Sequence, residues 1–193
     1  MARPQEFIPS QALHSAMNVF WLKGFEAASL ADIMAATGLS KSSLYATFGD
    51  KRSLFLAAFK AYQKERLRYL AEILEPGKPS RQSIQAFFNQ LVDYARDESH
   101  GCGCMTANEA VELAPHDPEV RQMVSDDFRA IEDLFSQAIT LGQADGSIAS
   151  RREPQVLARF LVVSLQGLQV MARAKVDRAQ LGESIQVIMA ALD

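Results

Sequence analysis

A short run of hydroxyl and amine side chains carries the clearest chemistry in the sequence. Small hydroxyls and a methyl group suit the edges of bases in the major groove of DNA. Lysine and tyrosine side chains suit the phosphates that flank this groove. Leu44 and Phe48 lie one helical turn apart and predict the inward side of a short helix over residues 41–48. The side chains left to face outward or toward the flanking backbones are Ser40, Lys41, Ser42, Ser43, Tyr45, Ala46 and Thr47.

Basic residues stand at two predicted helix starts. Lys41 opens one helix, and Lys51 and Arg52 open the next. The helix dipole disfavours a positive charge there by a few tenths of a kcal/mol, roughly. A phosphate at each helix start would bind both the cation and the free amide groups, which would explain why basic residues stand there. Lysines that are merely solvated are the alternative.

The two cysteines form the motif Gly101-Cys102-Gly103-Cys104, where a loop enters a helix. Amides at a helix start increase the thiolate fraction of a cysteine, so Cys102 or Cys104 could sense oxidants or electrophiles. Buried cysteines are usually inert, so a structural role stays open. The spacing of the two cysteines, with His100 and His116 nearby, is also a weak signal for a metal site. Because the signal is weak, we predict neither a metal nor a cofactor.

Apolar and polar side chains of the middle helices could line a cavity for a small molecule. Aromatic and Met residues at helical spacing usually belong to the core, so Asn108, Glu109 and Glu112 are the informative members. These three polar groups follow one another along a short helix, where they could orient a ligand or face solvent. The candidate lining residues are Phe88, Leu91, Tyr94, Met105, Asn108, Glu109, Glu112, Met123, Phe128 and Gln169.

Catalytic signatures are missing from the sequence. The three histidines, His14, His100 and His116, are scattered, and no nucleophile elbow, phosphate loop or paired-carboxylate motif is present. We therefore predict that the chain is not an enzyme. A helical adaptor that has kept a vestigial helix-turn-helix is a third possibility.

The elements that position these residues are predicted to be helices throughout. Hydrophobic residues make up 48% of the chain, and we find no alternation with a period of two that is long enough for a strand. Breaks at Gly24, Gly38, Pro76–Pro79 and Pro118 divide the sequence into about nine helical stretches. Ser29, Ser40, Asp50, Ser80, Asp117 and Asp177 are the predicted helix caps.

These helices predict an all-α fold with two domains. Two short helices joined by the turn at Gly38, with a third packed behind them, form a helix-turn-helix in residues 1–52, which include the start of a connecting helix. Residues 53–193 form a helical domain for ligand binding and dimerisation. The net charge of −3 is divided unevenly, because the first domain carries one more basic than acidic residue.

The last two helices predict a dimer. The stretch from Val156 to Met171 is apolar almost all round and must be covered on every side. Pairing it with residues 178–192 and their symmetry mates would give a four-helix interface, while a buried central helix of a monomer is the alternative. The predicted interface residues are Val156, Phe160, Val163, Gly167, Met171, Ile185 and Met189.

The cellular location follows from two further features. The N-terminus carries no apolar signal region, and no run approaches the ~18 apolar residues that span a bilayer. We predict a cytoplasmic protein without a membrane partner.

Residues 10–59 resemble the DNA-binding domain of the TetR family of transcriptional regulators. The resemblance includes Lys23-Gly24-Phe25, the run from Ser29 to Ile33 and the run from Gly38 to Lys51. Weaker similarity to the effector and dimer domain of that family lies at Gly101-Cys102, at residues 110–113 and 117–120, and from Phe160 to Leu168. Together these segments cover nearly the whole chain.

This resemblance implies a repressor that binds a palindromic operator in double-stranded DNA as a homodimer. It also implies that a small-molecule or redox effector releases the repressor from the operator. It implies Ser42 and Ser43 near base edges, Tyr45 and Lys51 on phosphates, and phosphate contacts from Ser29 and Ser40. Ala46 replaces a larger polar side chain of many members, which leaves only a methyl contact to thymine. It also places Cys102 in a glycine-cysteine pair that is buried in many members, with Cys104 in place of an aliphatic residue.

Overall fold

Helices make up all of the regular structure in the residues that a computed structural model of the chain describes, 8–75, 77, 79–96 and 103–193. This agrees with the predicted all-α fold. The helices in these residues are α1 (Pro9–Lys23), α2 (Leu30–Thr37), α3 (Lys41–Phe48), α4 (Lys51–Ile73), α5 (Ser80–Arg96), α6 (Met105–Glu112), α7 (Pro118–Asp145), α8 (Pro154–Arg173) and α9 (Arg178–Ala190).

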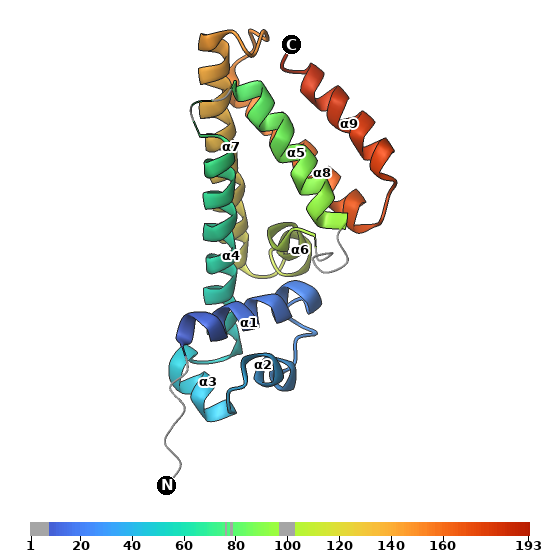
Figure 1. Cartoon of the computed structure of the whole chain (residues 1–193). Helices are drawn as coiled ribbons and strands as arrows, with labels where there is room; N and C mark the ends of the chain where they lie inside the picture. Colours follow the sequence, from blue (N-terminus) through green and yellow to red (C-terminus); the bar gives the residue numbers. More distant parts are fainter. Residues whose placement is uncertain (1–7, 76, 78, 97–102) are drawn as a thin grey trace.

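The helices divide into two groups along the molecule. Helices α1, α2 and α3 form one end, and α5, α8 and α9 form the other, while the long helices α4 and α7 connect the two ends (Figure 1). Helix α6 lies between the groups and packs against both α4 and α7. The helix-turn-helix thus sits at the far end of α4 from α9.

Local side-chain caps fix most helix starts where the sequence predicted them. Ser29 and Asp32 form a complete capping box at α2, and Ser40 accepts the amide of Ser43 at α3. Asp50, Asp117 and Asp177 cap α4, α7 and α9 in the same way. The prediction for Ser80 was wrong, because this residue is already the first of α5, and Pro79 precedes the helix and supplies the carbonyl that the first amides bind.

The N-terminal core is built from aromatic side chains of α1 and α4. The ring of Phe55 lies 5.3 Å from Phe20 and 5.8 Å from Phe59, between ring centroids, and all three side chains are buried. Met105 of α6 and Val120 of α7 belong to the same cluster. The helix-turn-helix therefore rests on α6 and α7, and any shift of these helices acts on its core directly.

The C-terminal core surrounds α8. Leu161 and Leu165 of this helix pack with Phe88 of α5 and Phe135 of α7, all at most 2% exposed. Among the described residues, α8 alone is long and apolar enough by length and composition to cross a bilayer. Its buried side explains this composition, because the core helix of a globular domain has the same character.

The assignment of Ile185 and Met189 to a dimer interface was wrong for this chain. Both side chains are at most 2% exposed and lie in the C-terminal core on the inner side of α9. Val187 is 72% exposed and faces outward from the same helix. A helix turns by 100° per residue, so a shift of two positions moves a side chain to the other side.

Candidate DNA interface and ligand pocket

The turn between α2 and α3 holds α3 at the surface. Gly38 ends α2 in the left-handed conformation, with φ of 69°, and donates its amide to the carbonyl of Met34. The side chain of Leu44 is 1% exposed and anchors α3 on the N-terminal core. Anchoring by one buried residue leaves most of the circumference of this short helix to solvent.

Most of the predicted DNA-contacting residues lie on α3 or at its start, whereas Ser29 caps α2 and Lys51 begins α4. Thr47 donates its hydroxyl to the carbonyl of Ser43 at 2.9 Å, and the hydroxyls of Ser42 and Ser43 lie 2.9 and 3.0 Å from that of Ser40. A hydroxyl that donates within the helix keeps free lone pairs and can still accept. Seven of these residues are exposed and Ser43 and Lys51 are half-buried, the exposed ones being Ser29, Ser40, Lys41, Ser42, Tyr45, Ala46 and Thr47.

Lys41 and Lys51 have no carboxylate partner among the described residues. The amine of Lys41 lies 5.6 Å from the ring centroid of Tyr45, and that of Lys51 lies 4.5 Å from that of Phe25. A cation over an aromatic face keeps its full charge and most of its hydrogen-bonding capacity. Both amines are therefore available to an anion.

Arg52 has a different partner from the phosphate that we expected at this helix start. Its guanidinium lies 2.8 Å from carboxylate oxygens of both Asp117 and Glu119, at the start of α7. Its hydrogen bond to Asp117 holds the pKa of that carboxyl below its usual range. Arg52 therefore links the start of α4 to the start of α7, and its position does not require DNA.

The starts of α3 and α4 differ in charge. Ser40, a neutral residue, caps α3, whereas the carboxylate of Asp50 caps α4 and accepts the amide of Ser53 at 2.7 Å. This backbone hydrogen bond lowers the pKa of Asp50. An ionised cap already occupies the amide of Ser53 and carries a negative charge at the start of α4, so a phosphate at this end would be bound by Lys51 more than by the helix start.

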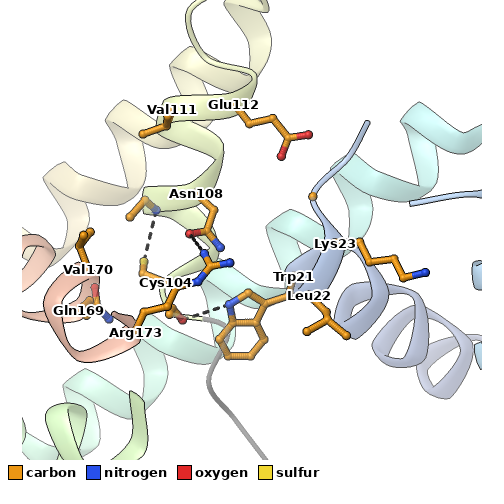
Figure 2. A pocket seen from close by; sticks show the side chains of 13 residues that line it. Trp21, Leu22, Lys23, Cys104, Asn108, Val111, Glu112, Gln169, Val170 and Arg173 are labelled. Atoms are coloured by element: carbon orange, nitrogen blue, oxygen red, sulfur yellow. Dashed lines mark hydrogen bonds between the residues drawn. The ribbon is translucent and has the colours of Figure 1, made fainter. Parts of the chain in front are cut away.

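A pocket of about 370 Å³ opens where α1, α6 and α8 meet. Asn108, Glu112 and Gln169 of the predicted ligand set line it, together with Cys104 (Figure 2). Apart from Gln169, the residues of α1 and α8 that line it were not in the predicted ligand set. The other lining residues are Trp21, Leu22, Lys23, Gly24, Gly103, Ala107, Val111, Val170 and Arg173.

Seven residues of the predicted ligand set do not line this pocket. Phe88, Met105 and Glu109 are fully buried, and Tyr94 is 47% exposed on α5. The partly buried side chains pack at the edges of the two cores, and these are Leu91, Met123 and Phe128. The expectation that apolar members are core residues by default thus agrees with their positions.

Cys104 is the N-cap of α6 and is 2% exposed. Its sulfur accepts the amide of Ala107 at 3.4 Å and a guanidinium N–H of Arg66 at 2.8 Å. Cys102 and His100 lie outside the described residues, and within these residues no group of three potential ligands is placed to hold a metal ion.

A buried ion pair lies behind Cys104. Arg66 of α4 pairs with Asp127 of α7, and the hydroxyl of Thr106 donates to the same carboxylate at 2.6 Å. Sequence analysis missed this pair. The signal was available, because each charged residue stands at a position in an otherwise apolar helical row, Arg66 between Tyr62 and Leu70 and Asp127 after Val124.

Hydrogen bonds, a ring contact and ion pairs join the helix-turn-helix to the rest of the chain. The indole N–H of Trp21 donates to the carbonyl of Gly103 at 3.1 Å, and its ring lies 4.9 Å from that of Tyr62. Glu112 accepts the amide of Glu26 at 2.9 Å. Together with the pairs of Arg52, these contacts connect α1 and α4 to α6 and α7, so the pocket lies directly at the junction.

Comparison with known proteins identifies the family. Residues 12–58 match the profile described as bacterial regulatory proteins, tetR family, and residues 80–188 match that described as Tetracyclin repressor-like, C-terminal domain. The chain is 31% identical to the HTH-type transcriptional regulator YezE of Bacillus subtilis, and the alignment covers all of both chains. This chain belongs to the TetR family. TetR-family proteins are DNA-binding transcriptional regulators and not enzymes, and the regulator described here is one of them.

Two further proteins are similar over most of their lengths. The HTH-type transcriptional repressor ComR of Escherichia coli is 29% identical over 89% of this chain and 82% of its own. The TetR-family regulator CifR was solved as a cysteine mutant with a 26-bp operator DNA, and its sequence is 31% identical to this chain. The two structures match with a TM-score of 0.87, over 99% of this chain and 100% of the CifR chain. The fold of this regulator, with its N-terminal helix-turn-helix and C-terminal helical domain, is therefore that of the family.

An apolar stripe runs along the outer side of α8 in this regulator. Its members recur every three or four residues, and an added Cβ at Gly167 would meet nothing within 4 Å. A groove of about 610 Å³ lies beside the stripe, between α8 and α9. The exposed apolar side chains of the stripe are Val156, Phe160, Val163, Val170 and Met171.

Proposed function

We propose that this regulator is a repressor that binds a palindromic operator as a homodimer and is released by a small-molecule or redox effector. The observation that carries the proposal is the exposed polar side of α3, next to two lysines that no carboxylate of the described residues neutralises. Three of the curated relatives are named repressors and one, at 25% identity, an activator, which favours repression. Its place of action would be the cytoplasm.

The residue roles follow from the surface that each side chain occupies. Ser42, Ser43, Ala46 and Thr47 would meet base edges, and Lys41, Tyr45 and Lys51 would meet phosphates, with Ser29 and Ser40 at the helix starts. The complex of CifR with operator DNA supports a double-stranded partner. The border between a DNA-binding domain and an effector domain would lie near residue 52, where α4 begins.

Dimerisation would cover the apolar stripe of α8. Val163 and Val170, 72% and 60% exposed, would be unfavourable on the surface of a monomer, because they form part of one continuous patch. Phe160 and Met171 line both the stripe and the groove, and Val187 lines the groove from α9. A second copy related by a twofold axis brings the same stripe to face itself, as an isologous interface requires.

The proposed function is tested by binding of the purified protein to its own upstream DNA. Binding is measured by fluorescence anisotropy over a range of salt concentrations. We expect Lys51→Ala to weaken binding to all sequences alike and to lower the slope of log K against log salt by about one. Lys64→Ala is the matched control, since Lys64 is an exposed lysine ~20 Å further along α4 and should change neither quantity.

Three results would count against the proposal. The first is no binding to the upstream DNA at any salt concentration, and the second is equal slopes for Lys51→Ala and the parent protein. The third concerns repression itself: a reporter behind the same DNA should be more active when the gene is deleted, and lower activity would make the regulator an activator.

A further inference from the structure

The pocket at the junction of α1, α6 and α8 is built from three segments that are distant in the sequence. The end of α1 contributes Trp21 and Leu22, α6 contributes Val111, and α8 contributes Gln169 and Val170. Its volume of about 370 Å³ suits a small molecule of the size of one or two rings. The pocket is distinct from the exposed side of α3, and it shares Val170 with the stripe of α8 that would form the dimer.

One polar group of the pocket lacks a partner. Gln169 is 7% exposed, and its side-chain carbonyl oxygen has no hydrogen-bond partner among the residues that the structure describes. Buried acceptors are normally satisfied, and an unsatisfied one destabilises the protein unless a water or a ligand supplies a donor. The pocket therefore offers an acceptor that is prepared for an N–H or O–H group.

The charged groups of the pocket already have partners. The guanidinium of Arg173 donates to Asn108 at 2.7 Å, and the amine of Lys23 pairs with Asp32 at 2.6 Å. The carboxylate of Glu112 accepts the amide of Glu26. A charged ligand would have to displace one of these contacts, whereas a neutral ligand would not.

The remaining wall is apolar and contains an aromatic ring. The indole of Trp21 lies beside Leu22, opposite the α6 side chains (Figure 2), and Val111 and Val170 complete the apolar surface. Flat rings stack on an indole and gain from apolar contact. The complementary molecule is therefore a small, flat and uncharged ring with a hydrogen-bond donor.

We infer that this pocket is the effector site of the regulator and that it takes small, uncharged, hydroxyl-bearing aromatic molecules, with the O–H donated to Gln169. The inference rests on the proposed function, in which an effector releases the operator. The pocket borders the close contact between the end of α1 and α6, where Trp21 bonds to Gly103 and where an added Cβ at Gly24 would lie only 2.3 Å from Glu112. We expect the ligand to bind more tightly when these two segments are further apart. A ligand that prefers the separated state shifts the population toward it and moves the helix-turn-helix.

The experiment uses Trp21, the only tryptophan of the chain, as the reporter. Resorcinol is titrated into the full-length protein while tryptophan fluorescence is followed, and 1,3-dimethoxybenzene, which has the same ring without O–H groups, serves as the control ligand. We expect saturable quenching by resorcinol and at least tenfold weaker binding of the dimethoxy compound. The same titration in the operator complex should show release of DNA at saturating resorcinol.

Two variants test the role of Gln169. Gln169→Met removes the acceptor and keeps the length of the side chain, and we expect at least tenfold weaker resorcinol binding. Gln122→Met is the matched control on the surface of α7, where Gln122 bonds only to Asp126 among the contacts described, and should bind as the parent does. Melting temperature and DNA binding without ligand are recorded for each variant, so that a folding defect is recognised.

The proposal is overturned if resorcinol gives no saturable quenching, if the dimethoxy compound binds equally well, or if folded Gln169→Met binds resorcinol like the parent protein. Resorcinol binding that leaves the operator complex intact would overturn the effector role of the pocket. Failure of the unliganded protein to bind its upstream DNA would instead contradict the proposed function, so the two failures are distinguishable.

Discussion

Glu109 should make the stability of this regulator depend on pH. The side chain lies on α6 with 0% exposure, and neither of its carboxylate oxygens has a hydrogen-bond partner in the described part of the chain. Burial, with a smaller effect of the neighbouring Glu112, raises the pKa of Glu109 from 4.5 to about 8. The group is therefore protonated in the folded protein at neutral pH and ionised in the unfolded chain.

The sign and size of the effect follow from this difference in protonation. Between about pH 4.5 and pH 8 the folded state binds one proton more than the unfolded state, so the free energy of unfolding falls as the pH rises. The slope is about 1.4 kcal/mol per pH unit, which amounts to roughly 3 kcal/mol between pH 5.5 and 7.5 and to at most about 5 kcal/mol over the whole window. Outside that window Glu109 contributes no slope.

The assay compares urea unfolding of the parent protein and Glu109→Gln at several pH values and at one protein concentration, because the proposed dimer would make stability depend on concentration. The amide of Gln does not ionise, so the variant should lack this contribution and its stability should fall less steeply by about 1.4 kcal/mol per pH unit. Glu72→Gln changes an exposed glutamate and should keep the slope of the parent protein. Equal slopes for Glu109→Gln and the parent protein would refute the argument from burial.

Four further substitutions probe the proposed dimer interface, the core and the start of α7. Val163→Asp places a carboxylate in the apolar stripe and should weaken the dimer at least tenfold in analytical ultracentrifugation; an unchanged dimer would remove this face from the interface. Phe135→Ala deletes a fully buried ring that packs against Phe87 and Phe88, and should lower the free energy of unfolding by about 3–5 kcal/mol. A loss below about 1 kcal/mol would show that the site collapses around the cavity. Asp117→Asn removes the charge that pairs with Arg52 and should cost less than about 1 kcal/mol, whereas Asp117→Ala also removes the helix cap and should cost about 1 kcal/mol more. Equal losses for the two variants would mean that the cap contributes nothing.

Features that depend on near neighbours could be predicted from the sequence. The starts of α2, α3, α4 and α7 lie at Ser29, Ser40, Asp50 and Asp117 because each cap binds an amide two or three residues ahead. The helix-turn-helix could be predicted for the same reason, since its turn at Gly38 and its anchor at Leu44 are local signals. The side of α3 that faces solvent follows from these two residues.

Only the tertiary structure decided which of two apolar sides of a helix is buried. Ile185 and Val187 of α9 are equally apolar, and packing against α5 and α8 places the first inside and the second outside. Packing likewise brought Arg52 to Asp117, 65 residues along the chain, although both had plausible local roles. The pocket is the clearest case, because Trp21, Glu112 and Gln169 meet only through the packing of α1, α6 and α8. Caps and turns are fixed within a few residues, whereas a surface built from distant segments exists only after the helices have packed.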